Sequence, residues 1–310
     1  MPRLFSAPSG LPPVLFVAGA LALVGGASAK EEAPFADVHL HYNWDHEEVT
    51  SPREAAERLA ANNVALGVVS GVPAPRALKL QEAADFPVIA LFSPYIHHRG
   101  RMDWFRDDEV VRRTREALAS GRFHGIGEVH FVASVGPPWD SPVFQGLLDL
   151  AREFDVPVLI HAESSDSEYF RPVCEANPEV RFQWAHAGSR LGPEEVEELM
   201  GSCPNVWTEL SARDPWRYGR FAGKEGGLDE AWVRLFKRFP DRFMTGSDPV
   251  WPPGSSMRWD QADSGWERVG QFLDYHRSWL AELPPDLARK IRLTNAKRFY
   301  AHALEGDRNQ

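Results

Sequence analysis

The chain has 310 residues, a length that suits either two small domains or one large barrel. Its hydrophobic fraction is 43% and its aromatic fraction 11%, so it holds enough apolar material for a packed core, which excludes disorder. Acidic residues outnumber basic ones by 44 to 34, and no basic tract is present, so we expect no nucleic-acid partner. A small-molecule substrate is compatible with this excess of acidic residues. Formation of a homo-oligomer is left open.

Residues 1–29 have the layout of a secretory signal peptide. Arg3 precedes an apolar run from Val14 to Val24, and Ala27-Ser28-Ala29 follows it. The run is too short to cross a bilayer of about 30 Å. Cleavage after Ala29 would leave a mature protein of residues 30–310, periplasmic or secreted, without stable membrane insertion. An uncleaved membrane anchor is the alternative, because a single Arg precedes the run.

The two cysteines, Cys174 and Cys203, lack the spacing of metal ligands. In an exported protein such a pair favours a disulfide, because the compartment is oxidising. Two buried free thiols remain the alternative.

Short β-rich apolar runs alternate with amphipathic helical stretches from residue 36 onward, a pattern typical of a parallel sheet. The expected strands are 36–41, 65–70, 88–92, 125–131, 156–161, 180–186, 206–210 and 242–246. Helical patterns between them include 52–61, 108–119, 142–154, 193–200 and 229–239.

Eight strands with crossover helices predict an α/β fold, a (β/α)8 TIM-type barrel forming one domain over residues 30–310. Residues 265–283 and 285–303 are expected to add C-terminal helices. A doubly wound open sheet is the alternative fold, but no glycine-rich phosphate loop follows the first strand.

Polar side chains stand at the ends of several expected strands, where this fold places its reactive groups. His39 and His41 lie two residues apart on strand one, so both side chains point to the same face. The other strand-end residues are Glu128, His161, His186 and Asp248. Imidazole and carboxylate ligands suit Zn²⁺, Mn²⁺ or Fe²⁺, so this set predicts a divalent-metal site. His46, His98 and His130 are minor candidates for the same site.

The motifs at these positions resemble the amidohydrolase superfamily, and more closely its amidohydrolase-related branch, also called amidohydrolase 2. They are Asp37-Val38-His39-Leu40-His41, Ile160-His161-Ala162, Ala185-His186-Ala187-Gly188, Gly246-Ser247-Asp248-Pro249 and Asn295-Ala296-Lys297-Arg298-Phe299-Tyr300. The resemblance implies that His39, His41, His161 and Asp248 surround a metal, with His186 as a further ligand or a transition-state partner. Glu128 departs from many relatives on this branch and is similar to the glutamate of TatD-type hydrolases, so one or two ions are expected.

We therefore expect a metal-dependent hydrolase of a small, anionic ester, lactone or amide, acting through a metal-activated water, with zinc as the first choice of ion. Asp248 would be the general base, and His186 would stabilise the oxyanion if it is not a ligand. Arg190 and Arg213 are the candidates to bind a substrate carboxylate or phosphate, and solvated surface arginines are the alternative. A metal-dependent decarboxylase or lyase, or a non-catalytic metal- or ligand-binding envelope protein, are the alternatives.

Overall fold

The computed structural model describes residues 33–163, 167–219, 221, 227–252 and 265–306. They belong to one compact unit, Ala33–Gln310. The expected signal peptide, residues 1–29, lies outside the described residues and stays a prediction. Within the described part, none of the helices combines the length and apolar character needed to cross a membrane.

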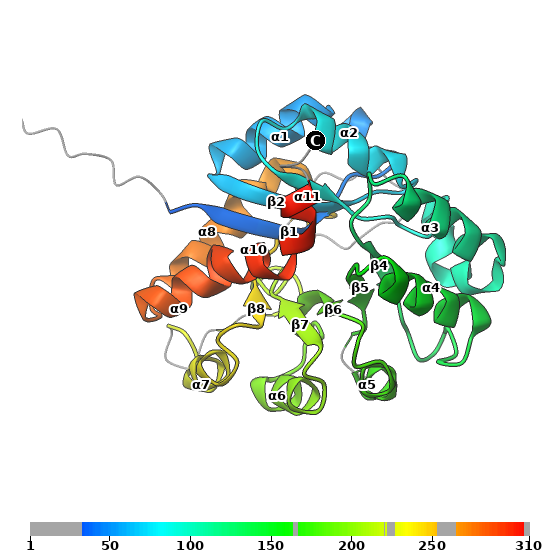
Figure 1. Cartoon of the computed structure of the whole chain (residues 1–310). Helices are drawn as coiled ribbons and strands as arrows, with labels where there is room; N and C mark the ends of the chain where they lie inside the picture. The colour runs from blue at the N-terminus through cyan, green and yellow to red at the C-terminus, as the bar shows by residue number, and fades with distance from the viewer. Residues whose placement is uncertain (1–32, 164–166, 220, 222–226, 253–264, 307–310) are drawn as a thin grey trace, which may run out of the picture. The chain divides into compact units, whose positions relative to one another are not determined.

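Eight strands are present in the described residues, each at a position expected from the sequence (Figure 1). They are β1 (Phe35–His41), β2 (Val64–Ser70), β3 (Val88–Ala90), β4 (Ile126–His130), β5 (Val158–His161), β6 (Phe182–Trp184), β7 (Val206–Glu209) and β8 (Phe243–Met244). Every paired neighbour runs parallel, in the orders β1-β2-β3 and β4-β5-β6-β7-β8.

Backbone hydrogen bonds join these two groups of strands at both seams. After β3, the amide of Phe92 donates to the carbonyl of Gly125 over 2.8 Å. Between β1 and the end of β8, the amide of Val38 donates to Thr245 over 3.0 Å. Because both seams are bonded, the sheet closes into the predicted barrel, and the doubly wound open sheet is excluded.

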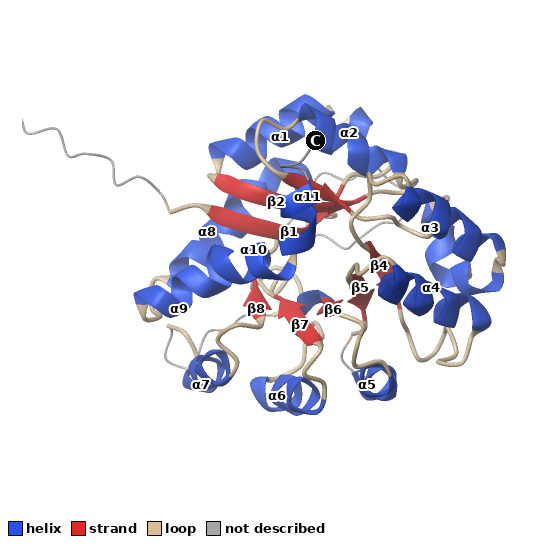
Figure 2. Ribbon diagram, in the orientation of Figure 1, coloured by secondary structure: helices blue, strands red, loops and turns tan. Residues whose placement is uncertain are grey.

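Helices cover the outside of the barrel (Figure 2). They are α1 (Pro52–Ala61), α2 (Pro75–Ala83), α3 (Glu109–Ala119), α4 (Pro142–Glu153), α5 (Ser167–Ala176), α6 (Pro193–Ser202), α7 (Glu230–Arg238) and α8 (Val269–Leu280). The start of α1 shows why such segments are helical: Ser51 and Glu54 form a capping box, and Pro52 occupies the first turn.

The C-terminal segment forms α9 (Pro285–Arg289), a π-helical turn (Lys290–Thr294), α10 (Asn295–Phe299) and α11 (Ala301–Gly306). Phe299 and Tyr300 are buried against strand residues such as Met244. Arg181, which precedes β6, donates to the carbonyl of Phe299 over 2.8 Å. The extra helices therefore close the end of the barrel where the strands begin, opposite the expected site.

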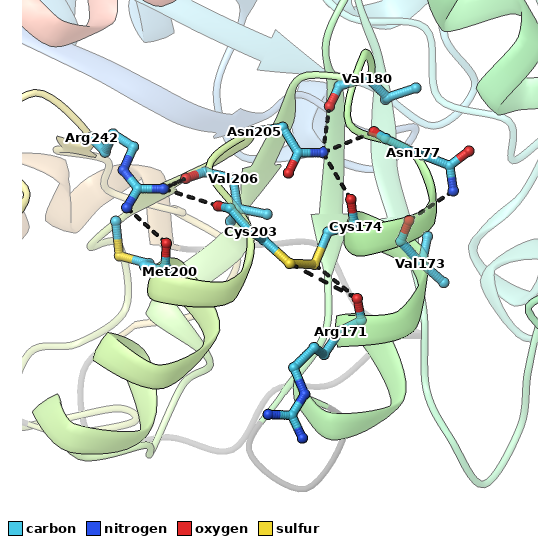
Figure 3. Close-up of a disulfide and its surroundings, with 10 residues drawn as sticks. All are labelled: Arg171, Val173, Cys174, Asn177, Val180, Met200, Cys203, Asn205, Val206 and Arg242. Carbon is cyan, nitrogen blue, oxygen red and sulfur yellow. Dashed lines mark hydrogen bonds between the residues drawn. A yellow bond between two sulfur atoms is a disulfide. The ribbon is translucent and has the colours of Figure 1, made fainter.

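Cys174 and Cys203 form a disulfide between α5 and the residue that follows α6 (Figure 3). Both residues are buried, and their Cα atoms lie 5.8 Å apart. The side-chain amide of Asn205 donates to the carbonyls of Cys174, Asn177 and Val180 beside the bridge. These segments lead into β6 and β7, so the bridge lies away from the strand ends that carry the candidate ligands.

Candidate metal and active site

The six strand-end residues expected to bind a metal converge at one buried site. Nε2 of His39 and Nε2 of His41 lie 3.0 Å apart. Nε2 of His41 lies 3.3 Å from Oε2 of Glu128 and 3.6 Å from Oδ1 of Asp248. Strand one thus presents two imidazoles to carboxylates from strand four and from the loop after strand eight.

His186, which follows β6, approaches both of these carboxylates, and His161 at the end of β5 approaches Glu128. Nε2 of His186 lies 3.8 Å from Oε1 of Glu128 and 3.9 Å from Oδ2 of Asp248. Nδ1 of His161 lies 2.7 Å from Oε1 of Glu128. The parallel barrel explains this convergence, because the carboxyl ends of its strands meet on one rim.

Hydrogen bonds on the outer nitrogens orient three of the four imidazoles. Nδ1 of His39 lies 2.8 Å from Oε1 of Glu209, and Nδ1 of His41 lies 3.2 Å from Oγ of Ser70. Nδ1 of His186 lies 3.2 Å from the carbonyl oxygen of Ser211, which can only accept, so this nitrogen carries the proton. The Nε2 lone pair of His186 therefore faces the cluster, as a metal ligand requires.

The electrostatics of the cluster call for a positive charge. Burial by itself lowers the pKa of His39, but the carboxylates of Glu209, Asp248 and Glu128 raise it to about 9. Burial likewise opposes the charge on His161, yet Glu128 and Glu163 raise its pKa to about 10. Burial lowers the pKa of His186 to about 4, which keeps this ring neutral.

This donor set fits a divalent metal ion. Three overlapping groups of described residues could each hold an ion: His39 with His41 and Asp248, His39 with Glu128 and His186, and Glu128 with His130 and His161. Glu128 belongs to two of these groups. Imidazoles and carboxylates of this kind are ligands of zinc and related ions.

The two residues with expected catalytic roles occupy unusual backbone conformations. His186 has φ +58° and Asp248 has φ +47°, in the left-handed region that non-glycine residues rarely adopt. The amide of Asp248 donates to the carbonyl of His39 over 2.8 Å, and the buried guanidinium of Arg217 donates to the carbonyls of Ser247 and Asp248. The surrounding structure thus holds Asp248 in place.

The structure does not bring the two predicted substrate arginines into the cluster. Arg213 is buried and donates to the carbonyls of Ala187 and Leu191, while its guanidinium lies 4.6 Å from the ring centre of Trp232. The guanidinium of Arg213 therefore fixes the loop after β6, and the predicted contact of Arg213 with a substrate stays a prediction. Arg190 is exposed on the same loop.

The three minor histidine candidates have different outcomes. His130 stacks on His161 with ring centres 4.6 Å apart, and its Nδ1 lies 3.0 Å from the hydroxyl of Tyr95. His46 is buried, and its Nδ1 accepts from the amide of Asn43 over 2.7 Å, which is a structural role. The side chain of His98 lies outside the described residues.

Sequence reasoning missed several residues that contact the cluster. Glu209 ends β7, so the strand-end rule that found Glu128 could have found it as well. Glu163 follows His161 by two residues, and its Oε1 contacts both Nε2 of His161 and the hydroxyl of Tyr218. Arg217 and Tyr218 come from the connection after β7, and no sequence pattern marks them.

The family model for amidohydrolases matches residues 36–301. This range covers most of the chain, which therefore belongs to the amidohydrolase family. No curated protein sequence matches the chain significantly.

Several solved structures share the fold at low sequence identity. A TatD homologue from Escherichia coli K12 is 15% identical with a TM-score of 0.60, covering 86% of this chain and 98% of its own. An amidohydrolase from Burkholderia multivorans with bound zinc is 16% identical with a TM-score of 0.55, covering 87% and 99%. A probable 2-pyrone-4,6-dicarboxylic acid hydrolase from Acinetobacter baumannii, with citric acid bound, is 16% identical with a TM-score of 0.52, covering 87% and 100%.

These likenesses establish the barrel, and the family match defines the class of enzyme. The protein is a metal-dependent hydrolase of the amidohydrolase superfamily. The buried imidazole and carboxylate groups described above are the residues that could bind its divalent ion.

Proposed function

We propose that this enzyme hydrolyses a small carboxylated ester, lactone or amide, with Asp248 as the general base. One observation carries the proposal: the Asp248 carboxylate lies 3.6 Å from Nε2 of His41 and 3.9 Å from Nε2 of His186, within a cluster of imidazoles and carboxylates. Asp248 is therefore adjacent to the candidate ligands, where the proposed attacking water would bind.

A divalent ion bound in this cluster supplies the Lewis acidity that activates water and polarises the substrate oxygen. The candidate ligands are His39, His41, Glu128, His161, His186 and Asp248. A carboxylate oxygen of Asp248 accepts the proton of the attacking water and then returns it to the leaving group. His186 acts as a ligand in this scheme, because its proton is on Nδ1 and its Nε2 lone pair faces the cluster.

Zinc is the proposed ion. Four imidazoles with two carboxylates form a donor set that zinc accepts readily, and one structural neighbour was crystallised with zinc. Glu128 contacts His39, His41 and His161, so its carboxylate would be a ligand to both ions if two were bound.

The proposed substrate is anionic. Arg101 in the segment after β3 is half-buried, and its guanidinium interacts electrostatically with Glu128 and Tyr95. Burial lowers the pKa of Arg101 to about 10, a value at which the guanidinium is still charged at neutral pH. We propose that this cation, rather than Arg213, binds a carboxylate of the substrate.

The test of this function begins with metal analysis of purified protein produced with added zinc or manganese. The loaded enzyme is then assayed against carboxylated esters, lactones and amides, and against aromatic carboxylates with detection of released CO₂. Acid release from an ester, lactone or amide that depends on the metal supports the proposal. Release of CO₂ without hydrolysis would replace it with a decarboxylase.

We also propose that the protein is exported and that the mature chain begins at Lys30. The Ala27-Ser28-Ala29 sequence and the disulfide between Cys174 and Cys203 support this proposal. N-terminal sequencing of the protein from the periplasm or the medium tests it directly. An intact Met1 in the recovered protein would contradict cleavage.

A further inference from the structure

Glu163 connects the candidate ligand His161 to a tyrosine from another loop. Its Oε1 accepts a hydrogen bond from the hydroxyl of Tyr218 over 2.9 Å and lies 2.9 Å from Nε2 of His161. Tyr218 belongs to the connection after β7, whereas Glu163 follows β5 by two residues. The side chains of Tyr218, Glu163, His161 and Glu128 therefore form a continuous chain of contacts that ends in the cluster.

The hydrogen-bonding chemistry of this chain determines which nitrogen of His161 can bind an ion. A carboxylate accepts hydrogen bonds, so the contact with Glu163 requires a proton on Nε2 of His161. Nδ1 of His161 faces Oε1 of Glu128 over 2.7 Å, a contact that needs either a proton or a cation. Glu128 is buried in the cluster and Glu163 lies at its rim, so a bound ion would replace the proton on Nδ1 and leave the proton on Nε2.

A comparison with His39 supports the same logic. Glu209 holds Nδ1 of His39 over 2.8 Å, which leaves Nε2 of that ring for the cluster. Glu163 contacts Nε2 of His161 instead, which leaves Nδ1 of that ring for the cluster. Two of the candidate ligands thus each have their own carboxylate, one buried and one at the rim of the site.

We propose that Glu163 is a positioning residue for the metal site: it fixes the Nε2–H form of His161, so that Nδ1 is the ligand atom, and Tyr218 holds Glu163 in place. This inference rests on the proposed function, because it assumes that His161 binds the ion. The side chain of Glu163 is 42% exposed, so its removal leaves no buried cavity and the fold should persist.

The experiment compares Glu163→Ala and Glu163→Gln with the native protein in zinc titrations against a chelator. Removal of the acceptor in Glu163→Ala should weaken zinc binding roughly 10- to 100-fold. Glutamine keeps an oxygen that can accept both bonds, so Glu163→Gln should recover part of that loss. Tyr218→Phe should give a smaller loss, because Glu163 remains but loses its donor. Glu168→Ala, on α5 with a 63% exposed side chain, is the matched control and should bind zinc normally.

A second measurement separates positioning from a general structural effect. In zinc-loaded protein labelled with ¹⁵N-histidine, Nε2–H of His161 should give a slowly exchanging signal, assigned through its absence in His161→Asn. That proton should exchange faster in Glu163→Ala and should be protected again in Glu163→Gln. Unchanged zinc affinity and unchanged protection in Glu163→Ala would overturn the inference while the metal site stands. A native protein that binds no zinc would instead overturn the proposed function and this inference with it.

Discussion

The carboxylate of Glu209 lies 2.8 Å from Nδ1 of His39, and both side chains are fully buried. The same oxygen accepts from the backbone amide of His186 over 2.8 Å. One carboxylate at the end of β7 therefore orients a histidine ring on β1 and the backbone of a histidine after β6. Burial raises the pKa of Glu209, but His39 and the hydrogen bonds outweigh it and lower this pKa to about 2, so the carboxylate stays ionised.

Glu209→Gln should weaken metal binding roughly 10- to 100-fold without unfolding the barrel. Both oxygens of Glu209 face hydrogen-bond donors, since Oε2 accepts from the amide of Ser211 over 2.7 Å. A glutamine has only one oxygen, so its NH₂ group must point toward one of these donors. The ring of His39 then loses either the negative charge beside its Nδ1 or the hydrogen bond that orients the ring. Zinc titration measures the effect, and Glu57→Gln on the exposed face of α1 is the control. Equal affinities of the two variants would remove Glu209 from this role.

Replacing both His39 and His41 with Ala should abolish metal loading, because their Nε2 atoms lie 3.0 Å apart in the cluster and would be two of its ligand atoms. Elemental analysis after growth with added zinc and manganese measures the metal content. His97→Ala, which changes an exposed histidine, should load normally. Less than half an equivalent of divalent metal in the native protein would contradict the site itself.

The sequence predicts the barrel well, because each of the eight strands has an apolar run bounded by turn residues. The strand-end rule also predicts the convergence of His39 with Asp248, which are far apart in the sequence but meet on one rim. The helical patterns in the sequence did not give bounds for α2 or for α5, which contains Pro172.

The contacts of loop residues are harder to predict from the sequence than those of strand residues, for a physical reason. A strand fixes the direction of its side chains by alternation, whereas a loop leaves an arginine free to reach in many directions. Arg213 donates hydrogen bonds to buried backbone carbonyls. Arg217, which was not predicted, donates a hydrogen bond to the carbonyl of Asp248. Contacts of this kind depend on packing between loops that are distant in the sequence.

Asp248→Asn should keep much of the metal and lose roughly 100-fold or more in turnover. The amide oxygen can still coordinate an ion, but the amide cannot accept the proton of the attacking water. Arg217 holds the backbone of residue 248, so the position of the side chain should be preserved. Rates and metal content are measured on the same preparation. Near-native turnover by a metal-loaded Asp248→Asn protein would exclude Asp248 as the base.

Removal of the disulfide should lower stability and leave the metal site intact. The bridge joins residues 29 positions apart, for which the chain-entropy model gives roughly 3 to 4 kcal/mol. Urea unfolding of the double variant Cys174→Ala with Cys203→Ala, compared with the native oxidised protein, measures this difference. Zinc affinity should not change, because the bridge precedes β6 and β7 while the cluster follows them. Two titratable thiols in denatured, unreduced protein would show that the bridge does not form.

His276 on α8 should make stability depend on pH in the acid range. Its Nε2 donates to the carbonyl of Gly246 over 2.8 Å, and its Nδ1 accepts from the indole of Trp279 over 3.2 Å, so the neutral ring uses both nitrogens. Burial lowers its pKa from 6.5 to about 4. Between these values the unfolded chain binds a proton that the folded chain does not.

The contribution of His276 is therefore fully present above pH 6.5 and is lost as the pH falls toward 4, with a slope of up to about 1.4 kcal/mol per pH unit. His276→Gln removes the titrating group, so its free energy of unfolding should fall less steeply over this range. Urea unfolding of both metal-free proteins between pH 4 and 7 gives the two slopes. Their difference isolates His276, because the histidines and carboxylates of the metal site titrate in both proteins. Parallel curves for His276→Gln and the native protein would contradict the prediction.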